Sequence, residues 1–217
     1  MPAVSVVVPV LNEAGNISPL VKEITEALSA LENFEIIYVD DGSTDETPNV
    51  LTELTKTVSE LHFLRHQKRA GQSAAIWTGV GAASFPLIAT LDGDGQNVPA
   101  NIPDLIHLYL RNSAPDGKLM VAGWRTGRKD SWSKKMASKI ANSVRSAMLG
   151  DNTPDTGCGL KVFRRVDYLS FPTFNHMHRF LPALMIRTGG RVISADVAHR
   201  TRRRGVSNYG VFDRLWV

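Results

Sequence analysis

The chain has 217 residues, of which 43% are hydrophobic and 21% charged, and its formal net charge is +4. This composition is ordinary for a globular protein, so it excludes a disordered chain and a body embedded in a membrane. A single cysteine, Cys158, excludes an internal disulfide and argues against a secreted scaffold. No apolar run reaches the ~20 residues of a membrane-spanning helix, and the N-terminus lacks a signal-peptide layout, so we expect a cytoplasmic protein.

Three apolar runs in the first half, at residues 4–10, 34–39 and 85–91, predict buried strands. No polar residues alternate within them, which is typical of strands covered on both faces in a parallel sheet. Helical patterns separate the runs, and one of these, GQSAAIWTGVGAA, is rich enough in small residues to pack tightly on a sheet. The alternation predicts a doubly wound α/β fold, with a mostly parallel central sheet and helices on both faces.

Two helix starts can be predicted from local signals. The first helix is expected to begin near Ser18, with Pro19 in its first turn, and to end near Leu31. The second follows the segment GSTDET, in which Ser43 and Glu46 have the spacing of a capping box.

The second half of the chain has a different pattern of elements. We expect a strand at 119–123, an amphipathic helix near 132–149, an apolar segment at 159–165, a helix within 176–190 and a strand at 191–199. No linker rich in Pro, Gly or Ser separates the halves. We therefore expect one domain over residues 1–217, in which about 1–117 and 118–217 are two halves.

Polar side chains follow the strands of the first half. Asn12 and Glu13 come after the first strand, Asp40 and Asp41 after the second, and the pair Asp92 and Asp94 after the run at 85–91. In doubly wound sheets, ligands bind beyond the carboxyl ends of the strands. Three acidic strand ends therefore predict one shared site.

The segment LDGDGQ places Asp92, Asp94 and Gln96 at alternate positions. Two carboxylates and an amide oxygen suit a hard divalent cation, Mg²⁺ or Mn²⁺, which would remove the repulsion between the carboxylates. The alternative is a surface turn, because such turns are rich in Asp and Gly. The position after a buried strand, with further acidic strand ends nearby, favours the metal.

Basic residues gather at 124–135 and at 199–205. Such clusters can hold nucleic acid, an anionic membrane surface or a phosphorylated substrate, and a solvated basic face is the structural alternative for each. The chain has neither a dinucleotide-type glycine loop nor a GxxxxGK[ST] loop. A bound nucleotide would therefore need metal and arginine to neutralise its diphosphate.

The segments VSVVVPVLNEAGNI, EIIYVDDGSTDET, RAGQSAAIWTGVGAA and LIATLDGDGQNVPANI, in this order, resemble the inverting family 2 glycosyltransferases, which share the GT-A nucleotide-sugar-binding fold. Later segments, including VAGWR, DTGCGLKVFRR and HRTRRRGVSNYG, are similar to the branch of dolichol-phosphate mannose synthase and bacterial polyprenyl-phosphate glycosyltransferases. The resemblance implies a hexosyltransferase that takes a sugar from a GDP- or UDP-sugar and passes it to a polyprenyl phosphate, with Mg²⁺ or Mn²⁺ as cofactor.

The resemblance also implies roles for individual residues. The nucleotide-sugar-binding group would be Pro9, Leu11, Glu13, Asp41, Gln72, Asp92 and Asp94. The acceptor-phosphate group would be Arg125, Lys134, Ser138 and Arg202. The metal ligands would be Asp92, Asp94 and Gln96, and the catalytic residues Asp92, Asp94, Arg125 and Arg202.

The chain departs from the family pattern where relatives carry positive charge. Gln72 and Asn208 stand where lysine is common, and Lys134 stands where arginine is frequent and lacks its bidentate geometry. These changes bear on acceptor affinity and donor identity. The apolar residues near Trp216 resemble the start of an amphipathic or membrane-spanning segment. Either the chain is trimmed, which is the interpretation we favour, or the protein reaches its lipid only peripherally. In both cases we expect it at the inner face of the membrane.

Other functions compete with this interpretation. A family 2 transferase acting on a saccharide hydroxyl would need a catalytic carboxylate near the acceptor, for which Asp155 is the candidate. A nucleic-acid-binding module is disfavoured, because no aromatic residues are interleaved with the basic ones for base stacking. A nucleotide-sugar sensor without activity is disfavoured by the intact Asp92 and Asp94. A homo-oligomer is compatible with the sequence.

Overall fold

The computed structural model describes residues 3–125 and 153–202. Its strands are β1 (Val4–Val10), β2 (Phe34–Asp40), β3 (Leu61–Arg65), β4 (Leu87–Thr90), β5 (Leu119–Arg125), β6 (Lys161–Arg164) and β7 (Arg191–Val197). Its α-helices are α1 (Ala14–Leu28), α2 (Thr47–Leu54), α3 (Gln72–Ala82), α4 (Ile102–Asn112), α6 (Arg165–Leu169) and α7 (Leu181–Arg187), and its 3₁₀ helices are η1 (Pro99–Asn101) and η2 (Met177–Arg179).

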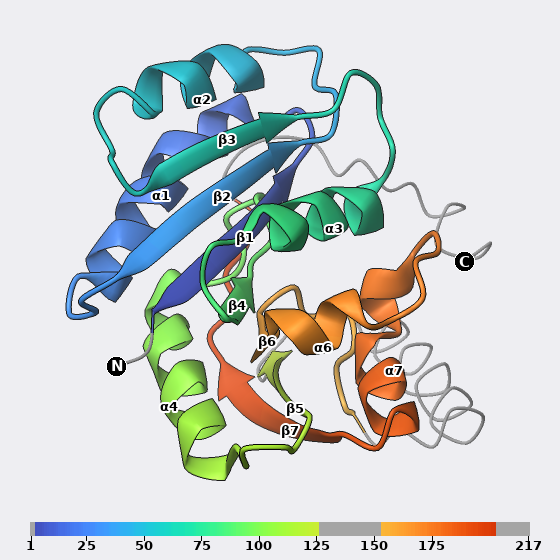
Figure 1. The fold of residues 1–217 in the computed structure, drawn as a ribbon. Helices are drawn as coiled ribbons and strands as arrows, with labels where there is room; N and C mark the ends of the chain where they lie inside the picture. Colours follow the sequence, from blue (N-terminus) through green and yellow to red (C-terminus); the bar gives the residue numbers. More distant parts are fainter. Residues whose placement is uncertain (1–2, 126–152, 203–217) are drawn as a thin grey trace.

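The strands of the described residues form one seven-stranded sheet, in the order β3-β2-β1-β4-β6-β5-β7 (Figure 1). Neighbouring strands are parallel from β3 to β4, and β7 is parallel to β5. β6 lies between β4 and β5 and is antiparallel to both. The expected mostly parallel α/β sheet is therefore confirmed, and strands from both halves of the chain share it.

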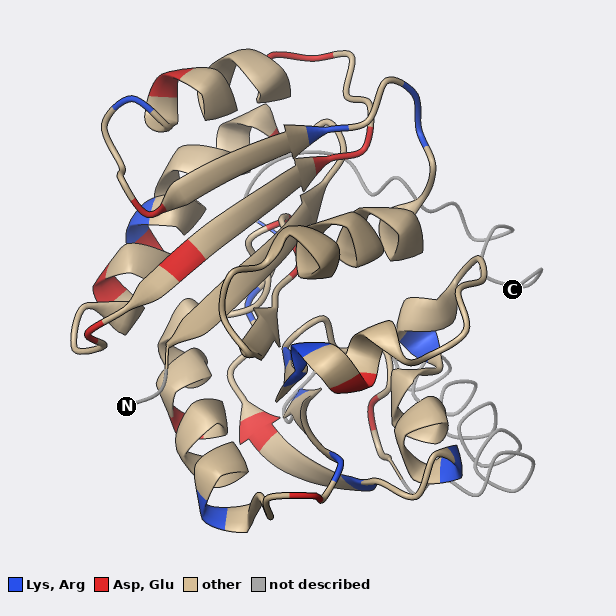
Figure 2. Cartoon of the chain, viewed as in Figure 1, with Lys and Arg blue, Asp and Glu red and all other residues tan. Residues whose placement is uncertain are grey.

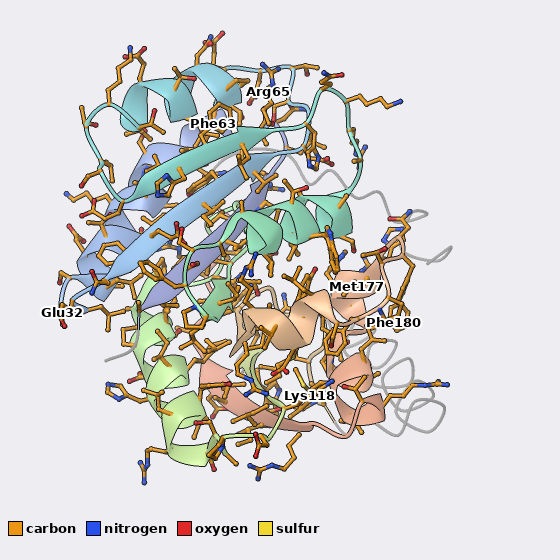
Figure 3. The ribbon with its side chains drawn as sticks, in the orientation of Figure 1. Glu32, Phe63, Arg65, Lys118, Met177 and Phe180 are labelled. Atoms are coloured by element: carbon orange, nitrogen blue, oxygen red, sulfur yellow. The ribbon has the colours of Figure 1, made fainter. Side chains whose placement is uncertain are left out.

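Alternate residues of β1 face two different cores. Val4, Val6 and Val8 belong to the core beneath α1 and α4, whereas Val7 belongs to the core beneath α3, α6 and α7. Successive strand residues point to opposite faces, so valines at consecutive positions, as at Val6, Val7 and Val8, are what a sheet covered by helices on both faces requires. Met177 lies in the second core, beneath α3 in Figure 3.

The small residues of α3 bring this helix close to the sheet, as expected. A Cβ on Gly79 would lie 2.5 Å from Cγ1 of Val7 and 3.1 Å from Cγ2 of Val39, so a larger residue would push α3 outward. The expected span of residues 71–83 matches α3 to within one residue at each end. This helix fixes the loop that precedes it, which contributes to the site.

The predicted start of the first helix is wrong. α1 begins at Ala14, so Pro19 lies inside it, and it ends at Leu28. The chain turns directly after β1 because Asn12 adopts the left-handed conformation, with φ of 57°, and donates its amide to Oγ of Ser43 at 2.8 Å. This tertiary contact overrides the local proline signal.

The predicted capping box before the second helix is also wrong. Glu46 is itself the N-cap residue of α2, and no side-chain hydrogen bond caps this helix. Ser43 accepts the amide of Asn12 instead, and Oδ1 of Asp45 accepts the amide of Thr47 at 3.0 Å. The polar residues of GSTDET therefore tie two loops together.

The expected strands at 119–123 and 191–199 correspond to β5 and β7, and the helix expected within 176–190 corresponds to η2 and α7. α4, which packs against β5, was not anticipated. The amphipathic helix expected near 132–149 lies outside the described residues. Over residues 3–125 and 153–202, no helix combines the length and the hydropathy needed to cross a membrane.

Candidate active site

The candidate site lies at the carboxyl ends of β1, β2 and β4. β1 pairs with β2 on one side and with β4 on the other, so the connections leave this point in opposite directions across the sheet. Such a switch in strand order leaves a crevice between the loops, where doubly wound proteins bind ligands. The acidic strand ends predicted from the sequence therefore meet at one edge of the sheet.

The loops after β1 and β2 are joined by hydrogen bonds. The amide of Glu13 donates to Oγ1 of Thr47 at 2.9 Å, and Oδ1 of Asn12 accepts the amide of Thr44 at 2.9 Å. Pro9 is buried in β1 opposite Val39, and Leu11 follows at the strand end, half-buried. These contacts fix the position of the loop after β1, which carries Leu11 and Glu13 of the predicted nucleotide-sugar-binding group.

Asp41 is buried and organises the loop between β3 and α3. Its Oδ1 accepts the amide of Ala70 at 2.8 Å and contacts Nδ1 of His66 at 2.8 Å, while Oδ2 accepts the amide of Gly71 at 2.7 Å. Nε2 of His66 in turn contacts Oγ1 of Thr78 at 2.9 Å. A carboxylate has about four acceptor positions, so Asp41 retains one for a ligand donor.

The neighbouring Asp40 has a structural role. It is fully buried, its Oδ1 accepts the amide of Ser43 at 2.9 Å, and its Oδ2 lies 3.2 Å from Nε of Arg65. Figure 2 shows the acidic end of β2 beside the basic end of β3, and Figure 3 labels Arg65 there. Of the two adjacent acids, Asp41 is therefore the one placed toward the site loops.

Asp92 and Asp94 lie beyond the end of β4, which finishes at Thr90. Oδ1 of Asp92 accepts Nε2 of Gln72 at 2.9 Å, and its Oδ2 accepts Nδ2 of Asn97 at 3.3 Å. Oδ1 of Asp94 accepts the amide of Gln96 at 3.0 Å. The predicted site residues Gln72, Asp92, Asp94 and Gln96 are thus brought together, and Asn97 is a buried member of the site that sequence reasoning missed.

The two carboxylates of this segment repel each other. Burial and, next, the charge of Asp94 raise the pKa of Asp92, against the lowering influence of Lys161 and Arg125. Burial also raises the pKa of Glu13, and Asp94 adds to that shift. Burial and the nearby charge of Asp94 therefore both disfavour ionisation of these two carboxyl groups.

This donor set fits a divalent cation that shares its coordination with a substrate. Asp92 and Asp94 supply two carboxylates and Gln96 an amide oxygen, all of them hard ligands. No group of three or more His, Cys, Asp or Glu side chains suited to a metal occurs among residues 3–125 and 153–202. An ion held here would need its other oxygens from water and from a bound diphosphate, as Mg²⁺ commonly does.

Arg125, at the end of β5, forms a bidentate ion pair with Asp155. Its Nε lies 2.6 Å from Oδ2 and its Nη2 2.7 Å from Oδ1, and both side chains are close to nine-tenths buried. The family resemblance implied that Arg125 binds the acceptor phosphate. Asp155 was the candidate catalytic carboxylate of the alternative, a transferase acting on a saccharide hydroxyl. The pairing makes Asp155 the residue that orients Arg125.

The last described loop crosses the site. Arg202 pairs with Oε1 of Glu13, whose Oε2 accepts Nδ2 of Asn16 at 2.6 Å. Arg200, which sequence reasoning did not select, donates to the carbonyl of Gly95 and to both carboxylate oxygens of Glu23. Arg202 therefore lies beside the loop that follows β1, and Arg200 anchors its own loop to α1. The expected acceptor residues Lys134 and Ser138 lie outside the described residues.

His178, in η2, is half-buried beside α3. Its Nδ1 lies 2.8 Å from Oγ of Ser73. Burial, followed by the charge of Lys161, lowers the pKa of His178 to about 3, so this imidazole is neutral at physiological pH. It contributes no cation to the site.

Replacing Gly159 with alanine is expected to lower kcat by about 100-fold, because small misplacements of reacting groups cost that much. A Cβ at this position would lie 2.2 Å from Oδ2 and 2.4 Å from Oδ1 of Asp92, so the carboxylate must move. Gly81→Ala is the matched control, since nothing lies within 4 Å of its added Cβ. Steady-state kinetics of both variants test this, and a normal kcat for Gly159→Ala would show that Asp92 is dispensable or adjustable.

Known proteins resemble this chain in sequence and in fold. The model of glycosyl transferase family 2 matches residues 5–169. Dodecaprenyl-phosphate galacturonate synthase of Rhizobium johnstonii is 35% identical over 212 residues, covering 95% of this chain and 62% of that protein. Undecaprenyl-phosphate 4-deoxy-4-formamido-L-arabinose transferase of Aeromonas hydrophila is 34% identical, covering 96% of this chain and 63% of that protein. The chain thus spans about three fifths of the length of these curated relatives.

Among solved structures, glucosyl-3-phosphoglycerate synthase of Mycobacterium tuberculosis, in complex with Mn²⁺, UDP-glucose and phosphoglyceric acid, superposes with a TM-score of 0.71. It is 20% identical, and the match covers 99% of this chain and 74% of that one. This likeness supports the fold. The chain belongs to glycosyl transferase family 2, and the family and GT-A fold expected from its motifs are confirmed.

Proposed function

We propose that this protein is a metal-dependent inverting glycosyltransferase that moves a sugar from a nucleotide-sugar donor to a polyprenyl phosphate. The names of the relatives that are 34–35% identical support this acceptor class. The observation that carries the proposal is that the turn at residues 155–159 links the two groups. Asp155 at one end pairs with Arg125, and Gly159 at the other end packs against the carboxylate of Asp92. Anionic and cationic groups thus adjoin at one site, as two phosphorylated substrates require.

The donor would be held by the loops after β1, β2 and β4. Pro9, Leu11 and Glu13 line the first loop, and Asp41 offers its remaining acceptor position to the base. Asp92, Asp94 and Gln96 would hold Mg²⁺ or Mn²⁺, which, when bound, neutralises charge on the leaving diphosphate. Gln72 supports Asp92 through its 2.9 Å hydrogen bond.

The acceptor would need positive charge more than it needs a base. A phosphate monoester carries about −1.5 to −2 charge at pH 7 and is already a competent nucleophile. Arg125, held by Asp155, would bind and orient its oxygens, together with Arg202, Lys134 and Ser138. Attack from the face opposite the leaving diphosphate would invert the anomeric centre.

The alternative acceptor, a saccharide hydroxyl, needs a general base. Asp155 was the candidate, and both of its oxygens accept hydrogen bonds from Arg125. This occupation favours the phosphate acceptor.

Because polyprenyl phosphates reside in membranes, the enzyme would act peripherally at the inner membrane face. There the basic segments 124–135 and 199–205 would contact anionic headgroups.

The test is product formation with undecaprenyl phosphate, Mn²⁺ and a panel of UDP- and GDP-sugars, followed by mass spectrometry of the lipid fraction. A lipid-linked sugar is expected with undecaprenyl phosphate and none with undecaprenol, which lacks the phosphate. Transfer to a saccharide hydroxyl alone would overturn the acceptor assignment. Binding of nucleotide sugar with no transfer to either acceptor would favour a sensor.

A further inference from the structure

A lysine to which the sequence motifs assigned no role lies beneath the site. Lys161 is the first residue of β6, and its neighbours in the sheet are Thr90 of β4 and Ala122 of β5. The residue is 4% exposed. Burying an ammonium group costs several kcal/mol unless partners compensate for the lost water, so its partners need to be identified.

The partners of Lys161 are backbone carbonyls of the turn at residues 155–159. Nζ donates to the carbonyl of Thr156 at 3.3 Å and also to that of Cys158. The same turn is held from the other side, because Oγ1 of Thr90 donates to the carbonyl of Gly159 at 2.6 Å. Lys161 therefore stabilises a turn whose two ends contact residues of the site.

Each end of this turn sets a functional side chain. At one end, Asp155 holds the guanidinium group of Arg125 at 2.6 and 2.7 Å. At the other end, Gly159 packs against the carboxylate of Asp92 so closely that a Cβ would lie 2.2 Å from Oδ2. Burial lowers the pKa of Lys161, and the charges of Asp92 and Asp155 are among those that oppose this lowering. One buried cation thus connects the donor side and the acceptor side of the site.

We propose that Lys161 is a positioning residue of the transfer reaction, which fixes the 155–159 turn and through it the separation between Arg125 and Asp92. This inference rests on the proposed function, because it assigns Arg125 to the acceptor phosphate and Asp92 to the donor diphosphate. Lys161 itself touches neither substrate. Its contribution is to keep the two anion-binding groups at one fixed spacing.

The test compares Lys161→Met with Lys161→Arg. Methionine fills a similar volume but donates no hydrogen bond, so kcat should fall by about 100-fold while the donor KM changes far less. Amide hydrogen exchange of the peptide covering 154–160 should accelerate by about tenfold, with β1 and β2 unchanged. Arginine retains the charge and the donors, so it should restore exchange protection and part of kcat.

Val162→Ala is the matched control for lost stability. Val162 is the next residue of β6, is fully buried and belongs to the core beneath α1 and α4. Its truncation should lower Tm by several degrees without changing kcat. The proposal is overturned if Lys161→Met retains wild-type exchange at 154–160, or if its kcat is no lower than that of Val162→Ala at a matched Tm.

Failure of the proposed function would be seen separately. If the wild-type protein transfers no sugar to undecaprenyl phosphate, the acceptor assignment fails, whereas the exchange measurement uses the protein without substrate. Accelerated exchange in Lys161→Met would then still establish that Lys161 holds the turn, and unchanged exchange would refute it.

Discussion

Asp94→Asn is expected to lower kcat by about 10³-fold, a loss typical of removing a group that stabilises developing charge. Oδ1 of Asp94 accepts one loop amide, that of Gln96, so this carboxylate can still offer charge to a cation. Asparagine keeps the shape of the side chain and removes the charge. Affinity for UDP or GDP in the presence of Mn²⁺ should fall to the level that the wild-type protein shows in chelator.

The same substitution should leave the metal-free fold at least as stable as the wild type. Burial and, next, the charge of Asp94 raise the pKa of Asp92, so removing that charge relieves a repulsion in the folded protein. Loss of function without loss of stability marks a residue kept for catalysis. Thermal shifts of the variant, with and without Mn²⁺ and UDP or GDP, measure both effects.

Asp116→Asn is the matched control, because Asp116 is exposed in the connection between α4 and β5 and has no role in the proposed site. It should bind metal and nucleoside diphosphate as the wild type does. The metal mechanism would have to be abandoned if wild-type turnover persisted in chelator, or if Asp94→Asn retained its Mn²⁺-dependent thermal shift.

The sheet could be predicted from the sequence because its strands are covered on both faces. The valine run of β1 supplies both cores through alternate residues, and such runs differ clearly from the helical patterns between them. Helix boundaries were less predictable. Pro19 indicated a start that the positive φ of Asn12 and its bond to Ser43 move to Ala14, and a contact over 31 residues leaves no local signal.

The site was predictable as far as it follows from strand ends. Asp41, Asp92 and Asp94 could be placed at one edge of the sheet because parallel strands end together. The partners that orient them could not, since β6 enters between β4 and β5 in the antiparallel sense. That insertion alone brings Lys161 and the 155–159 turn to Asp92, and no spacing in the sequence encodes it.

Arg125→Lys and Asp155→Asn are expected to act as one unit. Each should lower the turnover of undecaprenyl phosphate by about 100-fold, and the double variant should be no worse than the more damaged single variant, because residues that act together are non-additive. Lysine cannot reproduce the two-pronged contact at 2.6 and 2.7 Å. Asparagine leaves a largely buried guanidinium group without a carboxylate.

Comparing the two single variants with the double variant separates a positioning role of Asp155 from base catalysis, which the single variant Asp155→Asn cannot do. A loss in that variant is expected both if Asp155 orients Arg125 and if it removes a proton from a hydroxyl. Under base catalysis, Asp155→Asn would abolish the rising limb of the pH–rate profile, and the losses of the two variants would multiply. Under positioning, the profile keeps its shape and the acceptor KM rises in both variants. Multiplied losses together with a lost pH limb would therefore assign Asp155 to the hydroxyl-acceptor mechanism, and Arg125 would no longer be the group that recognises the acceptor phosphate.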